Sequence, residues 1–380
     1  MREIAYVSGT RADFGLMAPV LRAVQKSKKL KLQLYITGMH LMPRFGKTIN
    51  EVRKFFPAAK HIDAVFETDD RFGMARFAGE FLKKVAAVFE KQRPDTVLIL
   101  GDRIEMLLTA AAALYLGVPV AHIHGGEKTF TLDEVARHAI TKMAHIHFAA
   151  TKESAERIRK MGEEARRIHV VGAPALDVIL NEKLPTRAEL FQKLGINPEE
   201  KVILLTQHPV SEEFNDAGRQ IKETLAAVKS FGLPVVAIYP NADPGGREII
   251  KAIEKERKNP LFRIFKSLGH KDFLALEREA AVWVGNSSAA MIESSSFKTP
   301  CVNVGARQLG RRRGGNVIDV GYSRSEIKKA IKKSLYDKKY LVRLKKIKNP
   351  WGDGKTGPRI AKILEDLEIN RKLLTKQITY

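Results

Sequence analysis

The feature that most constrains the fold of this chain is a regular alternation of short apolar runs and longer amphipathic segments over its 380 residues. The run at 96–102 (TVLILGD) is apolar at consecutive positions, which is typical of a strand covered by helices on both faces. The segment after it, 103–117 (RIEMLLTAAAALYLG), has the length and composition of a helix. Repetition of this order predicts an α/β fold with parallel sheets and right-handed crossovers. Strands are expected at 3–9, 32–38, 96–102, 120–126, 146–151, 168–173, 202–208, 235–241, 262–267, 282–287, 301–306 and 316–321.

The alternation occurs twice, which predicts two Rossmann-like, doubly wound domains. Strand-like runs pause after 173 and resume at Lys201, and we interpret the segment between them as a connector. A chain of 380 residues also exceeds the ~150 residues of a typical single core. We therefore place the first domain at 1–176 and the second at 177–356.

The last segment, 357–375, is expected to form one helix. It begins GPRIAKILEDLEINRKLL, and its apolar residues recur at helical spacing. The residues of this apolar stripe are Ile360, Ile363, Leu364 and Leu367.

About half of the net charge of +23 arises near the C-terminus, where the residues from Gly321 onward include 17 Lys and Arg but only 6 Asp and Glu. Many of these lysines alternate with apolar positions at helical spacing, which is typical of solvated helix faces. No nucleic-acid-binding motif is recognisable, and aromatic residues make up only 7% of the chain, so we expect no nucleic-acid partner. Small anionic molecules are favoured as partners instead.

Membrane and export signals are not evident in the sequence. No apolar run reaches the ~18 residues that a membrane span needs. The first residues, MREIAYVSGT, lead directly into a strand without an apolar segment and cleavage site. The single cysteine, Cys301, lies in an apolar run and is predicted to be a buried thiol. We therefore expect a cytoplasmic protein that does not associate with membranes.

Polar residues and glycines follow the expected strands, in SGTR, LGDR, HIHGGE, TQHP, YPNAD, GNSS and NVGARQ. Ligands of open α/β sheets bind outside the carboxyl ends of the strands, so we expect these loops to line an interdomain cleft. Asp102 and Glu127 each follow a strand, and Asp133 lies a little further on. Carboxylates that meet in this way push their pKa values apart and can serve as one acid and one base. Alternatively, Asp102 bonds only its neighbours and Glu127 caps a turn.

The segment 282–297 (VWVGNSSAAMIESSSF) favours an anion site. It reads as a strand, a tight turn at Gly285 and a helix capped by Ser287 or Ser288. The start of a helix offers unpaired N–H groups to a phosphate. Glu293, further along, could accept hydrogen bonds from ribose hydroxyls. The alternative is an ordinary N-cap followed by a surface glutamate.

A glycine-rich loop between the last two expected strands also favours a phosphate ligand. Guanidinium groups match phosphate oxygens, and the loop contains Arg307, Arg311, Arg312 and Arg313. This arrangement suits a diphosphate, and the alternative is a solvated basic loop.

Two other patterns carry less weight. GDGKTG at 352–357 matches G-x-G-x-x-G and ends like a P-loop, but no strand precedes it, and Asn349 stands where a P-loop needs glycine. The histidine pairs at 122/124 and 145/147 have chelating spacing, but no third ligand follows at the spacing of a zinc site. We therefore expect no metal.

Taken in order, the motifs resemble the UDP-N-acetylglucosamine 2-epimerases, especially the hydrolysing branch that makes N-acetylmannosamine for sialic-acid-type sugars. The resemblance covers nearly the whole chain, from VSGTRADFGLM through LGDRIEM, HIHGGE, DEVARHAITKMAHIHF, TQHPV and YPNAD to GNSSAAMIE and NPWGDGKTG. It implies a fold of the GT-B type, with the sugar and catalytic side in 1–176, the nucleotide in 177–356, and the helix 357–375 crossing back to the first domain. It also implies a UDP-sugar substrate, UDP as a product, no cofactor and a homodimer.

The resemblance further implies a mechanism in which the C2 proton is removed while UDP leaves C1. Water then adds to the resulting 2-acetamidoglucal to give N-acetylmannosamine. Asp102 and Asp133 match the family's catalytic carboxylates. His124 stands where many members have glutamate (HIEGGE), so His124 and Glu127 are both candidates for the third catalytic position. Substrate binding is expected at Arg11, Arg137, His138, His208, Asn241, Ser287, Ser288, Glu293, Arg307 and Arg312.

The chain departs from the family pattern where TFTLDEVARHA replaces the commoner GxIDDSIRHA, which implies a different sugar pocket. The sugar could then be a 2,4-diacetamido-trideoxyhexose, or the base guanine rather than uracil. Three alternatives stay open. A non-hydrolysing epimerase often begins GTRPEAIKMAP, where this chain has GTRADFGLMAP. The other two are a GT-B glycosyltransferase and a non-catalytic sensor of nucleotide sugars.

Overall fold

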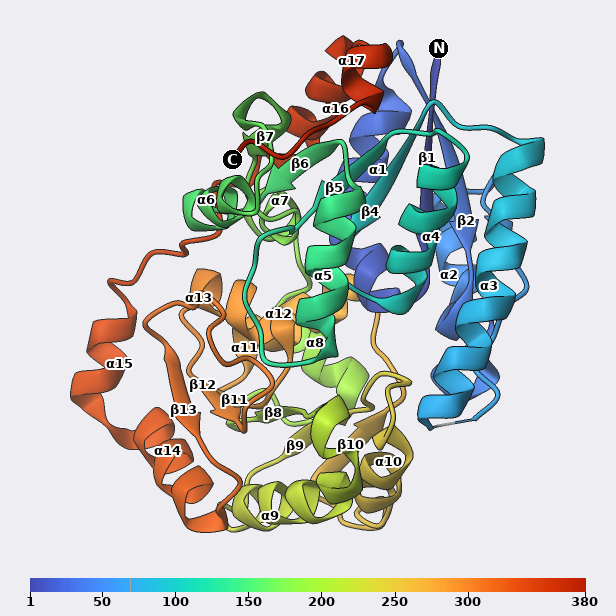
Figure 1. The fold of residues 1–380 in the computed structure, drawn as a ribbon. Coiled ribbons are helices and arrows are strands. Elements are labelled where there is room, and N and C mark those ends of the chain that lie inside the picture. The colour runs from blue at the N-terminus through green and yellow to red at the C-terminus, as the bar shows by residue number, and fades with distance from the viewer. Residues whose placement is uncertain (69) are drawn as a thin grey trace. The chain divides into compact units, whose positions relative to one another are not determined.

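The computed structural model describes residues 1–68 and 70–380, which fold into two α/β units (Figure 1). The first unit consists of Met1–Glu127, Leu132–Asn181 and Trp351–Tyr380. The second unit consists of Lys128–Thr131 and Glu182–Pro350. The interdomain cleft, the division at 176/177 and the assignment of sugar and nucleotide to the two domains stay predictions.

The first unit is built on a seven-stranded parallel sheet of order β3-β2-β1-β4-β5-β6-β7. Its order reverses between β1 and β4, which makes the loops after these strands the natural place for a ligand. The strands are β1 (Arg2–Ser8), β2 (Leu30–Ile36), β3 (Lys60–His61), β4 (Thr96–Leu100), β5 (Val120–Ile123), β6 (Ile146–Ala149) and β7 (Ile168–Val170). The helices are α1 (Arg11–Lys26), α2 (Ile49–Phe55), α3 (Arg71–Lys91), α4 (Ile104–Tyr115), α5 (Leu132–Met143), α6 (Lys152–Lys160), α7 (Ala175–Asn181), α16 (Thr356–Asp366) and α17 (Arg371–Leu374).

The second unit has a six-stranded parallel sheet of order β10-β9-β8-β11-β12-β13. Its strands are β8 (Ile203–Thr206), β9 (Val235–Ile238), β10 (Phe262–Phe265), β11 (Val282–Gly285), β12 (Cys301–Val304) and β13 (Val317–Val320). Its helices are α8 (Arg187–Leu194), α9 (Ala217–Lys229), α10 (Gly246–Glu254), α11 (His270–Glu279), α12 (Ser288–Ile292), α13 (Ser294–Phe297), α14 (Arg324–Tyr336) and α15 (Lys338–Leu344).

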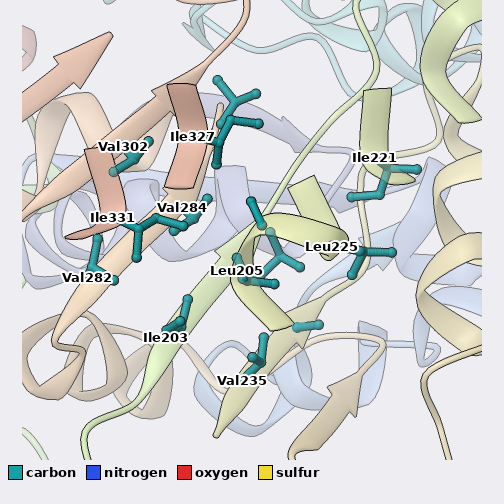
Figure 2. Close-up of a cluster of buried hydrophobic side chains, with 14 of the residues drawn as sticks. Ile203, Leu205, Ile221, Leu225, Val235, Val282, Val284, Val302, Ile327 and Ile331 are labelled. Carbon is teal, nitrogen blue, oxygen red and sulfur yellow. The ribbon is translucent and has the colours of Figure 1, made fainter. Parts of the chain in front are cut away.

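Aliphatic side chains form the core between this sheet and its helices. Figure 2 shows Ile203 and Leu205 of β8 together with Ile221 and Leu225 of α9, and all four are buried. Residues two apart on a strand point to the same face, so β8 presents both of its side chains to one layer of helices. Burial of each such aliphatic side chain stabilises the fold by about 1.5–3 kcal/mol. This packing fixes the strands from which the polar loops extend.

The expected strands are confirmed, since each coincides with one of β1, β2 and β4–β13. The strand that the sequence did not predict is β3, which has two residues, Lys60 and His61, both exposed. Because it lies at the sheet edge and contains no apolar residue, it shows no strand pattern.

The prediction of one helix over 357–375 is wrong, because α16 ends at Asp366 and α17 begins at Arg371. Between them, the Asn370 side chain accepts a hydrogen bond of 3.0 Å from the Leu373 N–H and so caps α17. Asparagine competes in this way with a continuing helix, and the apolar stripe did not reveal it. In the described residues, no helix is both long and apolar enough to cross a membrane.

Candidate functional site

The loops after β4 and β5 carry several of the polar residues that the sequence singled out, among them Asp102, His124 and Glu127. These strands pair with Leu100 opposite Ile123, and the Gly101 N–H extends the pairing with a 2.9 Å bond to the Ile123 carbonyl. Gly101 turns the chain with a φ of +70°, a conformation that suits glycine. Asp102 and His124 therefore leave the sheet from neighbouring strand ends.

Arg137 of α5 is the centre of this region and is only 1% exposed. Its guanidinium forms an ion pair with the Asp102 carboxylate. It also donates a 3.1 Å bond to the Glu127 carbonyl and contacts the Glu134 carboxylate at 3.2 Å. Burial by itself lowers the pKa of Arg137, but the surrounding negative charges outweigh it and raise the pKa. These charges belong to Asp102, Glu127 and Asp133.

Of the three carboxylates that the sequence singled out, Asp102 is ion-paired with this buried arginine, and Glu127 and Asp133 lie near enough to raise its pKa. Asp133 lies in the first turn of α5 and is partly exposed. Arg137 links the loops after β4 and β5 to α5. Its expected contact with the substrate stays a prediction. One buried cation allows several acids to approach one another without prohibitive repulsion.

His124 and Glu127 form a buried pair in the HIHGGE loop. The His124 Nδ1 atom is hydrogen-bonded to Glu127 Oε1, and the two side chains are 7% and 1% exposed. The His124 backbone has a φ of +65°, which is uncommon for any residue but glycine and is often found at functional sites. The imidazole also stacks on Trp351, with ring centroids 6.1 Å apart. These contacts hold the ring in one orientation with Nδ1 occupied.

The other histidines of the region have separate partners. His138 Nε2 lies 3.1 Å from Glu134 Oε1, and its side chain is 31% exposed. His122 Nε2 lies 2.7 Å from the Gly101 carbonyl, and burial lowers the pKa of His122 to about 3, so it is a neutral donor that supports the turn before Asp102. Across residues 1–68 and 70–380, no group of three or more His, Cys, Asp and Glu side chains is placed to hold a metal ion.

Arg11 begins α1, directly after β1. The helix starts with a capping box, in which Thr10 and Asp13 each bond the other's backbone N–H. The Arg11 guanidinium forms an ion pair with Glu51 of α2, and the two side chains are 21% and 28% exposed.

In the second unit, the loops after β8, β9 and β11 are tied together by hydrogen bonds. The Asn286 side chain accepts a 2.7 Å bond from the His208 N–H and donates a 2.9 Å bond to the His208 carbonyl. His208 Nδ1 accepts a 3.2 Å bond from the Asn241 N–H, which leaves the proton of the neutral ring on Nε2. His208 and Asn241, both expected at the site, are thus brought together.

Gly285 allows the turn in GNSS. A Cβ atom there would lie 1.9 Å from the Thr206 carbonyl oxygen, and the φ of +132° disfavours other residues. Ser287 caps α12, with no side-chain hydrogen bond to the helix among the described residues, and Ser288 is its first residue. The helix has five residues and ends at Ile292.

Glu293 is not the surface glutamate of the alternative interpretation, because it is only 2% exposed. Burial raises its pKa to about 7, against the opposing effect of a hydrogen bond from Glu277. A carboxyl with this pKa changes charge near neutral pH.

The arginines of the loop after β12 have different surroundings. Arg307 donates a 3.3 Å bond to the Asn286 carbonyl, and Arg312 is exposed. Arg311 is buried and donates to Gln308 Oε1 at 3.1 Å. Arg313 pairs with Asp319 of β13. The loop is therefore an ordered structure rather than a freely solvated one, and Arg312 is its most exposed guanidinium.

Sequence reasoning missed four residues that organise these regions. Asn286 and Gln308 connect the loops after β11 and β12. Gln308 Nε2 donates a 3.0 Å hydrogen bond to the Asn286 carbonyl. Glu134 contacts both Arg137 and His138, and Trp351 stacks on His124. Asn286 lies inside the GNSS motif and could have been found there, whereas the Trp351 contact joins positions far apart in the chain.

The two parallel sheets, with polar loops after their strands, define an α/β protein of the GT-B type. Residues 22–365 match the sequence model of a family described as UDP-N-acetylglucosamine 2-epimerase. The chain belongs to the UDP-N-acetylglucosamine 2-epimerase family.

Three similar proteins illustrate the relationship. A hydrolysing UDP-N,N'-diacetylbacillosamine 2-epimerase of Legionella pneumophila is 39% identical over 381 residues, covering 100% of both chains. A UDP-N-acetylglucosamine 2-epimerase of Neisseria meningitidis is 33% identical and covers 88% of both. A crystal structure of a UDP-GlcNAc 2-epimerase from Neisseria meningitidis, bound to UDP-GlcNAc, has a TM-score of 0.79 at 20% identity. It covers 96% of this chain and 100% of that one, which shows the shared fold.

Proposed function

We propose that this protein is a hydrolysing 2-epimerase that acts on a UDP-linked 2,4-diacetamido-trideoxyhexose. The observation that carries the proposal is the group of three carboxylates around the buried Arg137. Family membership supports a reaction at C2 of a nucleotide sugar. The full-length relative that is 39% identical supports both hydrolysis and a sugar with two acetamido groups.

The surroundings of Asp133 also favour a sugar less polar than N-acetylglucosamine. Leu132 and Val135 flank the first turn of α5 and are 61% and 66% exposed. Exposed apolar side chains suit the methyl groups of a 4-acetamido, 6-deoxy sugar better than the hydroxyls that N-acetylglucosamine has at these carbons. We assign these two residues to the sugar pocket.

The first step breaks two bonds of the sugar. The C1–O bond to UDP breaks with its electrons going to the diphosphate, a base removes the proton at C2, and a C1=C2 double bond forms. Positive charge builds on the ring as UDP leaves ahead of the proton. Asp102 and Asp133 stabilise this charge, because carboxylates aimed at a developing cation act most strongly in the transition state. Water then adds at C1 and a proton returns to C2 from the other face.

We assign the third catalytic position to His124, with Glu127 orienting it. Glu127 occupies Nδ1, which leaves Nε2 as the ring nitrogen that can exchange a proton with the sugar. Trp351 fixes the plane of the ring. This arrangement explains how histidine can stand where many members of the family have glutamate.

The nucleotide is assigned to the second unit. We assign Arg307 and Arg312 to the diphosphate, together with the backbone N–H groups of Ser287 and Ser288. We assign His208 and Asn241, on the linked loops after β8 and β9, to the nucleotide as well. Glu293 is assigned to the ribose hydroxyls. Arg11 and His138 complete the expected contacts in the first unit.

Chemical rescue tests the assignment of His124. His124→Gly, which suits the φ of +65°, is expected to lower kcat by about 10²–10⁴-fold. Imidazole added to this variant is expected to restore part of kcat by filling the space beside Trp351. The matched control is Glu127→Gly with formate. Rescue of Glu127→Gly by formate, without rescue of His124→Gly by imidazole, would assign the proton transfer to Glu127 instead.

Proton NMR in D2O tests the reaction itself. Incubation with the UDP-diacetamido sugar is expected to release UDP and the free 2-epimeric sugar, with deuterium at C2. The same experiment with UDP-N-acetylglucosamine, the sugar nucleotide in the name of the Neisseria relative, examines the second candidate, production of N-acetylmannosamine and UDP. Faster turnover of UDP-N-acetylglucosamine would favour that substrate. A UDP-linked 2-epimer would indicate the non-hydrolysing reaction, and two intact substrates would refute the proposal.

A further inference from the structure

Glu277, on α11 of the second unit, is fully buried and has no assigned role. In residues 1–68 and 70–380, no hydrogen-bond donor reaches either of its carboxylate oxygens. Its backbone carbonyl, by contrast, accepts a 2.7 Å bond from Thr299 Oγ1. A buried carboxylate without donors is strongly unfavourable, so this carboxyl must satisfy its polar atoms in another way.

The neighbour that can satisfy Glu277 is Glu293. Helix α11, which carries Glu277, packs against α13, and Glu293 directly precedes α13. The two carboxyls are close enough for each to shift the pKa of the other. Two carboxylates cannot bond each other, whereas a carboxylic acid can donate to a carboxylate. The pair therefore holds one proton between its two members.

The surroundings decide which member keeps the proton. Burial, together with the charge and hydrogen bond of Glu293, raises the pKa of Glu277 well above its ordinary value. Burial raises the pKa of Glu293 less, to about 7, because the hydrogen bond from Glu277 opposes it. Since both enclosed oxygens of Glu277 lack a hydrogen-bond donor among the described residues, we assign the shared proton to Glu277, which leaves Glu293 as the member that can ionise.

Few other charges face the pair. On β12, burial and the charge of Asp319 raise the pKa of the Cys301 thiol, and this thiol also lies within electrostatic range of Glu277. Arg313 acts on that thiol in the opposite direction. Among the described residues, no basic side chain contributes to the pKa shift of either glutamate.

We propose that Glu277 is a positioning residue of the nucleotide site, which donates a hydrogen bond to Glu293 and holds its carboxylate in place to accept bonds from the ribose hydroxyls of UDP. This inference rests on the proposed function, because it assumes that Glu293 contacts the nucleotide. Beyond that function, we infer that the neutral carboxyl of Glu277, which does not contact the ligand, sets the charge and orientation of the Glu293 carboxylate. UDP binding then requires Glu293 to be ionised.

Isothermal titration calorimetry of the full chain with UDP, from about pH 6 to about pH 8, tests the proposal. Below about pH 7 the wild-type affinity is expected to fall by up to about tenfold per pH unit, because the fraction with ionised Glu293 falls. The terminal phosphate of UDP also titrates, with a pKa near ~6. Glu293→Gln, which cannot titrate, is the control that isolates the contribution of the phosphate.

Two substitutions separate positioning from a purely structural role. Glu277→Met removes the donor but fills the space, so the variant is expected to fold and to bind UDP roughly tenfold more weakly at neutral pH. The midpoint of its pH profile is expected to rise by about one pH unit, because Glu293 loses the bond that favours its ionised form. Glu277→Gln keeps an N–H donor and is expected to rescue both the affinity and the midpoint.

Each outcome decides between the two proposals. Unchanged midpoints in both variants, with wild-type UDP binding intact, would overturn the role of Glu277 and leave the proposed function standing. If the wild type fails to bind UDP at every pH, the nucleotide site and this inference fall together.

If Glu277→Met does not fold, infrared spectra of the wild type and of Glu277→Gln still test the shared proton. A carboxylic acid band that persists in the wild type at about pH 8 and is missing in Glu277→Gln supports the shared proton, and no such band overturns it.

Discussion

Asp102→Asn is expected to lower kcat by about 10³-fold or more while leaving the Kd for UDP within about twofold. The substitution keeps the shape of the side chain but removes the charge that would face the positively charged sugar ring. Because this charge develops only as UDP leaves, the loss is expected in kcat rather than in ground-state binding. Steady-state kinetics and calorimetry with UDP measure the two quantities.

The control for this substitution is Asp366→Asn at the end of α16. Asp366 is also an ion-paired carboxylate of the first unit, 3.1 Å from Lys362, but it is 54% exposed. Its neutralisation is expected to change neither kcat nor Kd. If Asp102→Asn weakened UDP binding as much as it lowered kcat, Asp102 would contribute to uniform binding and not to the chemical step.

Arg137→Leu is expected to reduce the free energy of unfolding by about 3–5 kcal/mol and to abolish turnover. Arg137 is 1% exposed, so its removal leaves the Asp102 charge poorly compensated and deprives the Glu127 carbonyl of its donor. Chemical denaturation followed by circular dichroism measures the stability. Arg159→Leu on α6 is the matched control, because its ion pair with Glu156 lies at the surface. Little change in unfolding is expected there.

A double variant identifies the cause. In Arg137→Leu with Asp102→Asn the uncompensated carboxylate is gone, so part of the lost stability is expected to return while turnover stays absent. If the two substitutions reduced stability additively, the ion pair would not be the source of the Arg137 effect. The buried arginine would then act through its packing and its bonds to Glu127 and Glu134.

The strands and the carboxylate motif could be predicted because each depends on residues close together in the chain. Strands such as β4 are recognisable from consecutive apolar residues, and parallel neighbours place Asp102 next to the HIHGGE loop. The break between α16 and α17 was missed because the capping bond of Asn370 competes with an intact apolar periodicity. The edge strand β3 was missed because its pairing with β2 depends on the sheet and not on its own composition.

The sequence alone therefore defined the α/β architecture, the family and the loops that carry polar residues. These follow from periodicity and from motifs that are local and ordered along the chain. The partners and protonation states of individual side chains, by contrast, depend on the tertiary structure. Arg137 lies among three acids, and Glu277 against Glu293, because separate elements bring them together in a buried environment. Burial and partner charges set the protonation of such groups, and no local pattern encodes them.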